Sequence, residues 1–163
     1  MIEEGTTNLI EQYEPGASQD WSKWDHWNSS KYWYSTTQYD DPIWGKVFYG
    51  KAKRDNGGNT YIYNYSPTIS VTAGTTYTFS FYVKTSSNLT QSFMAYFAYY
   101  ASSTFDSTTK TYTLKANEWT RVEFQLTPST SRSDAKYGVH FVNVPDGTYF
   151  WIAYPQIEAK PYA

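Results

Sequence analysis

The chain has 163 residues, of which 21% are aromatic (18 Tyr, 9 Phe and 7 Trp) and only 17% are charged, with a formal net charge of −2. This length suits one domain, and the slightly acidic balance excludes a nucleic-acid binder that works by neutralising phosphates. The absence of cysteine excludes disulfides, thiolate metal sites and a cysteine nucleophile. No run of 18 apolar residues is present to insert into a membrane.

The N-terminal third has the least regular pattern. Residues 1–5 lack the basic and apolar regions of a signal peptide, and a short strand is expected at Asn8–Tyr13. From Trp21 to Trp44, tryptophans alternate irregularly with Ser, Asp, Lys and Asn. This segment is therefore predicted to form long loops with short pieces of strand.

The rest of the chain alternates with a period of two and is rich in Thr, Tyr, Phe and Val, which predicts strands separated by turns. Polar stretches predict loops at Ser102–Ser107 and Ser129–Ser133. Pro145-Asp146-Gly147 is a strong turn signal and is predicted to join the last two strands as a hairpin. The strands are expected at Lys46–Ala52, Thr60–Tyr65, Thr68–Val71, Thr76–Lys84, Gln91–Tyr100, Lys110–Leu114, Trp119–Leu126, Tyr137–Val144 and Thr148–Ile157.

About ten short strands with turn signals between them predict an all-β fold, an antiparallel sandwich or barrel. Four segments resemble jelly-roll carbohydrate-binding modules over residues 8–163. They are an opening strand at Asn8–Ile10, a turn and aromatic strand at Ser70–Lys84, a Trp-led strand at Asn117–Phe124 and a closing strand at Asp146–Glu158.

The C-terminal segment narrows this resemblance. Pro155–Glu158 followed by Pro161–Ala163 is most similar to modules of bacteriophage tail and other virion structural proteins. The resemblance implies a two-sheet jelly-roll sandwich, a single module over residues 1–163 excised from a longer protein, in a virion or outside the cell. It implies no required cofactor and a possible structural calcium, for which Glu3, Glu4, Glu14 and Glu158 are available ligands.

Tryptophans of the irregular segment are candidates for glycan binding. Trp24, Trp27 and Trp33 lie among Asp, His, Asn and Lys. An indole stacks on the apolar face of a sugar ring, and polar neighbours of this kind bond its hydroxyls. The alternative is that these rings pin a long loop onto the sandwich; for Trp44, which precedes a strand, both interpretations stay open.

Two predicted strands also present aromatic side chains away from the inferred core. Tyr82 and Lys84 do so in one strand, and Tyr96 and Tyr100 in the next. If the two strands are neighbours in one sheet, these side chains form an aromatic surface. The alternative is ordinary cross-strand pairing of tyrosine on a solvated sheet.

A basic loop follows the strand Lys46–Ala52, which itself contributes Tyr49 to the candidate surface. Arg54 in this loop presents a planar fork of donors that suits a phosphate or carboxylate of an anionic wall polysaccharide. The alternative is a solvated hairpin tip. Trp119 and Trp151, in contrast, are expected to pack in the core or at a sheet edge.

Catalysis is not expected. A glycoside hydrolase needs two carboxylates flanking the scissile bond, and the available ones sit in turns or on outward strand faces. His26 and His140 are too few and too far apart for a metal site, and no Ser-centred elbow appears. The carboxylates considered are Asp25, Asp40, Asp41, Asp55, Glu118 and Glu123.

The sequence therefore favours a non-catalytic module that binds a bacterial cell-surface polysaccharide and supports phage adhesion through weak sites that gain from multivalency. In this interpretation, Trp27→Ala or Trp33→Ala lowers binding without unfolding the domain. Two alternatives stay open. One is a structural module packed against other virion proteins, and the other is an accessory module of a secreted bacterial glycoside hydrolase.

Overall fold

The computed structural model describes residues 24–25, 33–53, 59–65, 68–99 and 104–159. Within these ranges the chain forms strands, turns and bends, and no helix there is long and apolar enough to cross a membrane. The strands are β1 (Trp24–Asp25), β2 (Trp33–Asp41), β3 (Gly45–Ala52), β4 (Asn59–Tyr65), β5 (Ile69–Val71), β6 (Tyr77–Thr85), β7 (Leu89–Tyr99), β8 (Thr104–Leu114), β9 (Thr120–Leu126), β10 (Arg132–Val142) and β11 (Tyr149–Glu158).

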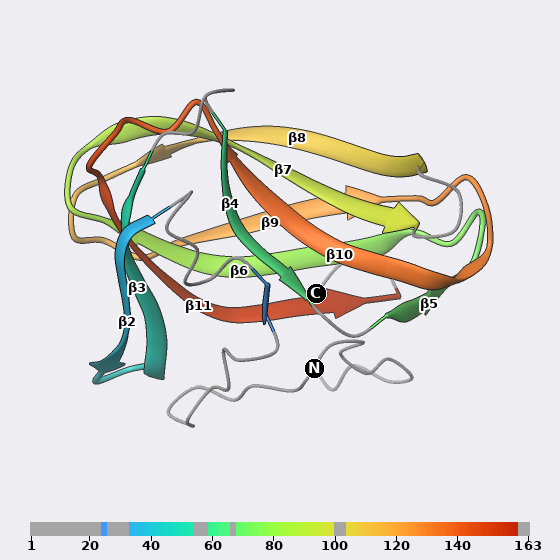
Figure 1. The fold of residues 1–163 in the computed structure, drawn as a ribbon, viewed down its shortest axis with the longest axis horizontal. Helices are drawn as coiled ribbons and strands as arrows, with labels where there is room; N and C mark the ends of the chain where they lie inside the picture. Colours follow the sequence, from blue (N-terminus) through green and yellow to red (C-terminus); the bar gives the residue numbers. More distant parts are fainter. Residues whose placement is uncertain (1–23, 26–32, 54–58, 66–67, 100–103, 160–163) are drawn as a thin grey trace, which may run out of the picture.

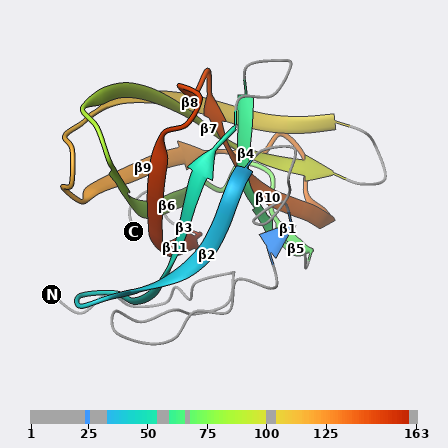
Figure 2. The ribbon, with the colours of Figure 1, turned by 60° about the vertical axis from the view of Figure 1, so that its left-hand side comes forward.

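The strands form two antiparallel sheets that face each other (Figures 1 and 2). The first sheet has the order β1-β4-β10-β7-β8, with β5 paired to β10, and the second has the order β2-β3-β11-β6-β9. This arrangement confirms the predicted jelly-roll sandwich. It also means that each sheet has one face toward the core and one outer face.

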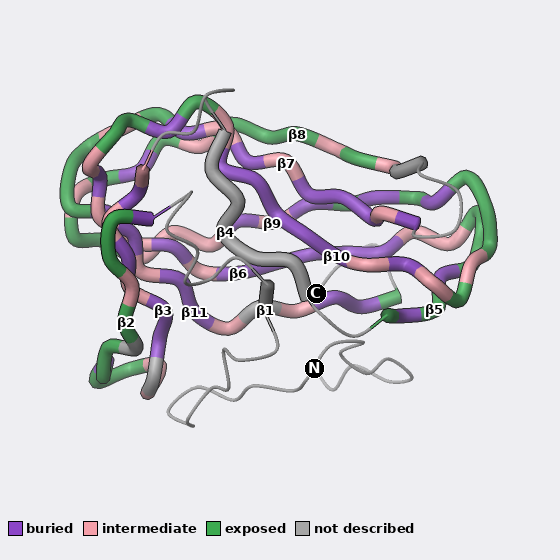
Figure 3. The backbone as a smooth tube through the Cα atoms, viewed as in Figure 1, coloured by how far each residue is buried: buried purple, intermediate pink, exposed green. Residues whose placement is uncertain are grey.

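Aromatic rings fill the space between the sheets. Phe79 on β6 makes edge contacts with Phe97 on β7 and Tyr137 on β10, with ring centroids 4.9 and 4.7 Å apart. Phe93 and Phe141 pack in the same way at 4.6 Å. All five side chains are fully buried, in agreement with the alternation predicted for these strands, and Figure 3 shows buried positions recurring along β7 and β10.

The condition for an aromatic surface shared by β6 and β7 is not met, and the predicted hairpin of the last two strands is wrong. Strands β6 and β7 follow one another in the chain but lie in different sheets, so they do not form one aromatic surface. Strands β10 and β11 also lie in different sheets, so the turn at residues 143–148 is not a hairpin. The turn itself is present, but backbone hydrogen bonds tie Gly147 and Thr148 to Ala52 at the end of β3, which directs the chain into the second sheet.

Three strands extend into segments that were predicted as loops. Strand β2 is nine residues long, β8 begins at Thr104 and β10 begins at Arg132. The reason is that β2 and β8 are sheet edges, where polar and hydroxyl side chains are tolerated and the apolar alternation is weak. The strand expected at Asn8–Tyr13 lies outside the described residues.

A tyrosine joins the two sheets at one edge. Tyr112 on β8 donates its hydroxyl to the backbone carbonyl of Glu123 on β9 and accepts from the backbone N–H of the same residue, both at 3.0 Å. Its ring packs against Phe93 in the core. One side chain therefore satisfies both polar groups of a residue on the edge strand β9, and this blunts an exposed sheet edge.

Trp33 belongs to this core. It is 2% exposed and packs edge-on against Phe48 with ring centroids 4.8 Å apart. Its ring lies so close to Gly50 that a Cβ built there would meet Trp33 Cε3 at 2.7 Å. This favours the packing alternative at Trp33, and because removing such a ring costs about 3–5 kcal/mol of stability, we expect Trp33→Ala to destabilise the fold as well as any site.

We expect Gly50→Ala to lower the free energy of unfolding by about 1–3 kcal/mol, because the new methyl group overpacks the site beneath the indole. The measurement is urea denaturation of the wild type and the variant. In a Trp33→Leu background the same substitution should cost clearly less, since the smaller side chain leaves room. An equal cost in both backgrounds would contradict the contact.

A polar cluster forms where the C-terminal end of β7 meets the N-terminal end of β8, and it consists of Tyr99, Asp106 and Ser129. The Tyr99 hydroxyl donates to Asp106 Oδ2 at 2.5 Å, and the same carboxylate accepts from the backbone N–H and the hydroxyl of Ser129. Burial, followed by the hydrogen bond to Asp106, raises the pKa of Tyr99. The folded state therefore favours the neutral phenol.

Because the folded-state pKa is raised, the stability contributed by Tyr99 is present below the ordinary tyrosine pKa of about 10 and declines as the pH rises above it. We expect Tyr99→Phe to lower the free energy of unfolding by about 1 kcal/mol at pH 7. The difference from the wild type should shrink above pH ~10. Denaturation curves at several pH values measure this, and a constant difference across that range would contradict the assignment.

Candidate functional site

The outer face of the second sheet carries a continuous layer of aromatic side chains, here called the aromatic belt. In β3, β6 and β11 alternate residues face the core, and the intervening ones form this layer. Direct cross-strand pairing puts Tyr49, Trp151 and Lys84 in one row across three strands. The rings of the belt are Tyr39, Trp44, Tyr49, Tyr82, Trp119, Tyr149, Trp151 and Tyr154.

The rings of the belt form two groups, and within each group the rings contact one another. In one group, Tyr49 stacks on Tyr149 with an interplanar angle of 14° at 5.5 Å, and it lies 4.6 Å from Trp151. In the other, Trp44 lies 4.4 Å from Tyr82 and 5.8 Å from Tyr154. Offset ring contacts of this kind hold the rings in fixed orientations and add to the stability gained from burial alone.

The turn between β2 and β3 places Trp44 in the belt. The Asp41 carboxylate accepts from the backbone N–H groups of Ile43 and Trp44 at 2.8 and 3.0 Å, and Gly45 adopts a positive φ of 76°. A side-chain-capped turn that ends on a left-handed glycine is a compact hairpin connection. The hairpin of β2 and β3 projects from the body of the sandwich in Figure 2, and its turn leaves Ile43 60% exposed.

Two small apolar residues lie beneath the rings. Val47 on β3 and Ala153 on β11 are both 0% exposed, although their positions in the alternation put them on the outer face, and neither belongs to the central core cluster. The aromatic rings therefore shield part of the outer face from water. The belt is a third layer of the structure rather than a set of independent surface residues.

The backbone is strained at one ring of the belt. Tyr154 has a φ of +54° and sits where the pairing of β11 with β6 shifts between Ala153 and Gln156. A bulky residue in the left-handed region is a genuine outlier, and a bulge redirects the side chain that it contains. The result is that Tyr154 packs against the core and also stacks on Trp44.

Positive charge lies between the two groups of rings. Lys84 Nζ is 5.2 Å from the centroid of Trp119 and 4.7 Å from that of Trp151, within the range of cation–π attraction. The indole N–H groups of Trp44 and Trp151 have no acceptor in the part of the chain that the structure describes. Burial raises the pKa of Tyr49, so its hydroxyl is a neutral donor and acceptor at physiological pH.

Four predicted site residues meet in the belt: Trp44, Tyr49, Tyr82 and Lys84. Trp151 is not a core residue, since it lies on the outer face of β11, and it completes the row with Tyr49. Sequence reasoning left out five of the belt rings, because β11 carries apolar residues on both faces and the edge segments showed no clear pattern. These five are Tyr39, Trp119, Tyr149, Trp151 and Tyr154.

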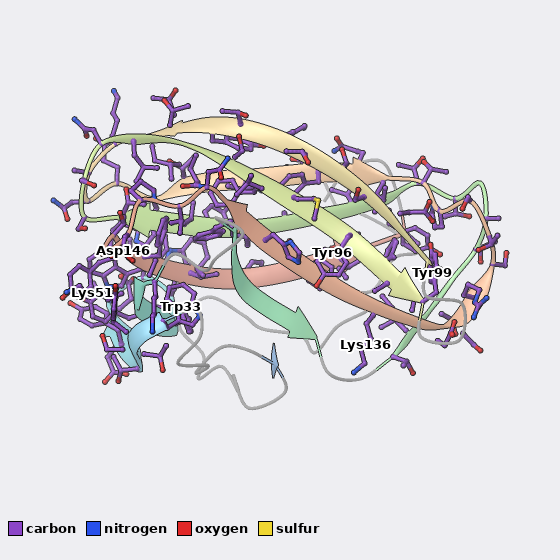
Figure 4. The ribbon with its side chains drawn as sticks, turned by 45° about the horizontal axis from the view of Figure 1, so that its top comes forward. Trp33, Lys51, Tyr96, Tyr99, Lys136 and Asp146 are labelled. Atoms are coloured by element: carbon purple, nitrogen blue, oxygen red, sulfur yellow. The ribbon has the colours of Figure 1, made fainter. Side chains whose placement is uncertain are left out.

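The other predicted residues are not part of the belt. Tyr96 is 8% exposed and lies on the outer face of the first sheet, where its ring meets that of His140 edge-on at 4.8 Å. Figure 4 shows Tyr96 midway along the sandwich, whereas Trp33 and Lys51 lie at one end. Trp33 is in the core. Trp24 forms part of β1, its side chain is not described, and Trp27, Arg54 and Tyr100 lie outside the described residues.

The described residues hold no group of three or more His, Asp and Glu side chains that could bind a metal ion. Among the acids considered for catalysis, Asp41 caps a turn and Glu123 is bonded to Arg121. Both carboxylates therefore have structural partners. The predicted calcium stays a prediction, because three of its four proposed ligands lie outside the described ranges.

Solved structures with this fold include arabinose-bound MgGH51 α-L-arabinofuranosidase (TM-score 0.70, 13% identity) and the CBM22-1-GH10 modules of Clostridium thermocellum xylanase 10B complexed with xylohexaose (TM-score 0.58, 13% identity). The match to the arabinofuranosidase includes 92% of this chain but only 26% of the enzyme chain, and the match to the xylanase includes 94% of this chain but only 28% of the enzyme chain. The family 11 carbohydrate-binding module of the same organism, in complex with a β-1,3-1,4-mixed-linked tetrasaccharide, matches at a TM-score of 0.56 with 14% identity, 94% of this chain and 98% of that chain. At these identities the likeness establishes the fold alone.

No curated protein sequence matches the chain. The family described as "Carbohydrate binding domain" matches residues 12–148, which is most of the chain and includes most of the belt. The family match agrees with the two jelly-roll sheets and with the aromatic outer face. The chain therefore belongs to the family of carbohydrate binding domains.

Proposed function

We propose that the chain is a non-catalytic module that holds a polysaccharide against the aromatic belt. The observation that carries this proposal is the row of Tyr49, Trp151 and Lys84 on the outer face of the second sheet, flanked by further rings on both sides. An aromatic ring covers the apolar C–H face of a sugar, while phenol hydroxyls and the ammonium group bond its polar edge. A surface that is built from one sheet suits an extended chain of sugars.

The finer part of the proposal is the biological setting. The C-terminal resemblance to phage virion modules supports host adhesion, with cell-surface polysaccharide and other virion proteins as partners and a place on the virion or outside the cell. The matches to about a quarter of an arabinofuranosidase and of a xylanase chain support the second candidate, an accessory module of a secreted glycoside hydrolase. In both settings the module binds sugar and performs no reaction.

The face that binds is tested by paired variants. We expect Tyr49→Leu and Trp44→Ala each to weaken binding to a polysaccharide about tenfold, because each removes a stacking surface worth roughly 1–3 kcal/mol. Tyr96→Leu, on the outer face of the first sheet, should leave binding unchanged. Titration followed by tryptophan fluorescence or calorimetry measures the affinities, and circular dichroism checks folding. Loss of binding in Tyr96→Leu alone would move the site to the first sheet.

Ile43→Ala separates a glycan from a protein partner. Ile43 is 60% exposed and lies next to Trp44, so a flat protein interface over the belt would bury it, whereas sugar stacking depends on the neighbouring ring. Unchanged polysaccharide binding in Ile43→Ala, beside a clear loss in Trp44→Ala, is the expected pair of results. Absence of polysaccharide binding by the wild type, together with binding to a protein partner that both variants weaken, would favour the structural-module alternative.

Host adhesion is tested with multimers. We expect a labelled trimer of the module to decorate whole bacterial cells at least a hundredfold more strongly than the monomer, because linked weak sites raise the effective concentration. A trimer of the Tyr49→Leu variant is the matched control. If the trimer binds plant cell-wall particles but binds none of the tested bacteria, the accessory-module setting is favoured.

A further inference from the structure

The aromatic belt carries ammonium groups that no carboxylate of the described residues neutralises. Among the described residues, Lys84 Nζ lies over the rings of Trp119 and Trp151. Lys51 Nζ lies 5.8 Å from the centroid of Tyr149 and 5.5 Å from that of Tyr34, also without an ion pair in the described ranges. Both ammonium groups therefore lie on or beside the belt with aromatic rings as their partners among the described residues.

Three acidic side chains near this face already have hydrogen-bond or ion-pair partners. Glu123 is paired with Arg121, and Asp41 caps the turn between β2 and β3. Asp146 accepts hydrogen bonds from the Tyr34 hydroxyl at 2.9 and 3.1 Å. The chain as a whole has a net charge of −2, so the placement of Lys84 between two indoles is a local arrangement and not a consequence of overall composition.

The position of Lys84 is set by the sheet. It is paired directly with Trp151 on β11, and Trp151 is paired with Tyr49 on β3, so the ammonium group closes one end of the row that a stacked sugar would follow. Lys51 on β3 is paired with Tyr149, two residues before Trp151 on β11 and two strands away from β6, which puts the two lysine backbones roughly 12 Å apart. A polymer lying across the strands would pass both charges.

From this arrangement we propose that the belt selects anionic polysaccharides, in which a carboxylate or phosphate group meets Lys84 while the adjoining sugar ring stacks on Trp151 or Tyr49. An anionic group that meets the ammonium group above the two indole faces gains a charge-assisted hydrogen bond without first breaking an ion pair to a carboxylate of the described residues. This inference rests on the proposed polysaccharide-binding function and names its ligand class.

The experiment compares three polymers: polygalacturonate, which carries carboxylates; a poly(glycerol phosphate) wall polymer bearing sugars; and a neutral mixed-linkage β-glucan. The expected result is tighter binding of at least one anionic polymer than of the neutral one, with a preference that falls when NaCl is raised from 50 to 500 mM. Salt at that level screens exposed charges within a few ångströms. The polymer that binds more tightly identifies carboxylate or phosphate as the preferred group.

The matched variants are Lys84→Met, which keeps a long apolar stem over the indoles, and Lys84→Arg, which keeps the charge. Lys84→Met should weaken binding to the preferred anionic polymer about fivefold, which corresponds to ~1 kcal/mol, and should weaken binding to the neutral polymer clearly less, because only the anionic group interacts with the lost charge. Lys84→Arg should retain most of the affinity.

Three results would overturn the inference. Equal binding of neutral and anionic polymers by the wild type would do so while the proposed function stands. An equal loss for all polymers in Lys84→Met would make Lys84 a packing residue and would also leave the proposed function intact. Absence of binding to every polymer would overturn both.

Discussion

The second sheet buries apolar side chains on both of its faces, and the architecture of the candidate site depends on this. On β11, Phe150 and Ile152 enter the core while Tyr149 and Trp151 enter the outer layer. A strand that is apolar on both sides is stable in water only if a second layer covers it. In this chain the cover consists of rings, which leaves an organised aromatic surface at the boundary with solvent.

The sequence predicted the sandwich well because its core strands alternate clearly. In β6 the odd-numbered residues from Tyr77 to Val83 are aromatic or aliphatic, and in β9 Val122, Phe124 and Leu126 are separated by polar residues. Period-two contrast of this kind determines which face is buried. The polar edge strand β8 lacks the contrast, and its extent follows from continuous pairing with β7, which is a long-range property.

The candidate site was predictable only in part, for two physical reasons. Alternation assigns a residue to a face of its own strand but does not say which strands share a sheet, so Tyr82 and Tyr96 were grouped although they lie on opposite sides of the sandwich. In the segment Tyr-Phe-Trp-Ile-Ala of β11 every residue is apolar, so neither face could be called outer. Trp44 and Lys84, in contrast, follow from local signals, a capped turn and a clean strand.

The bulge at Tyr154 has a consequence for the shape of this surface. Strands in regular register present their side chains at nearly the same height above the sheet. A single left-handed residue interrupts that level and turns one phenol toward the indole that comes from the hairpin. The backbone conformation of Tyr154 therefore makes this part of the aromatic layer uneven. A related chain with the same rings but an unbroken final strand would offer a flatter platform and a different preference for curved or straight polymers.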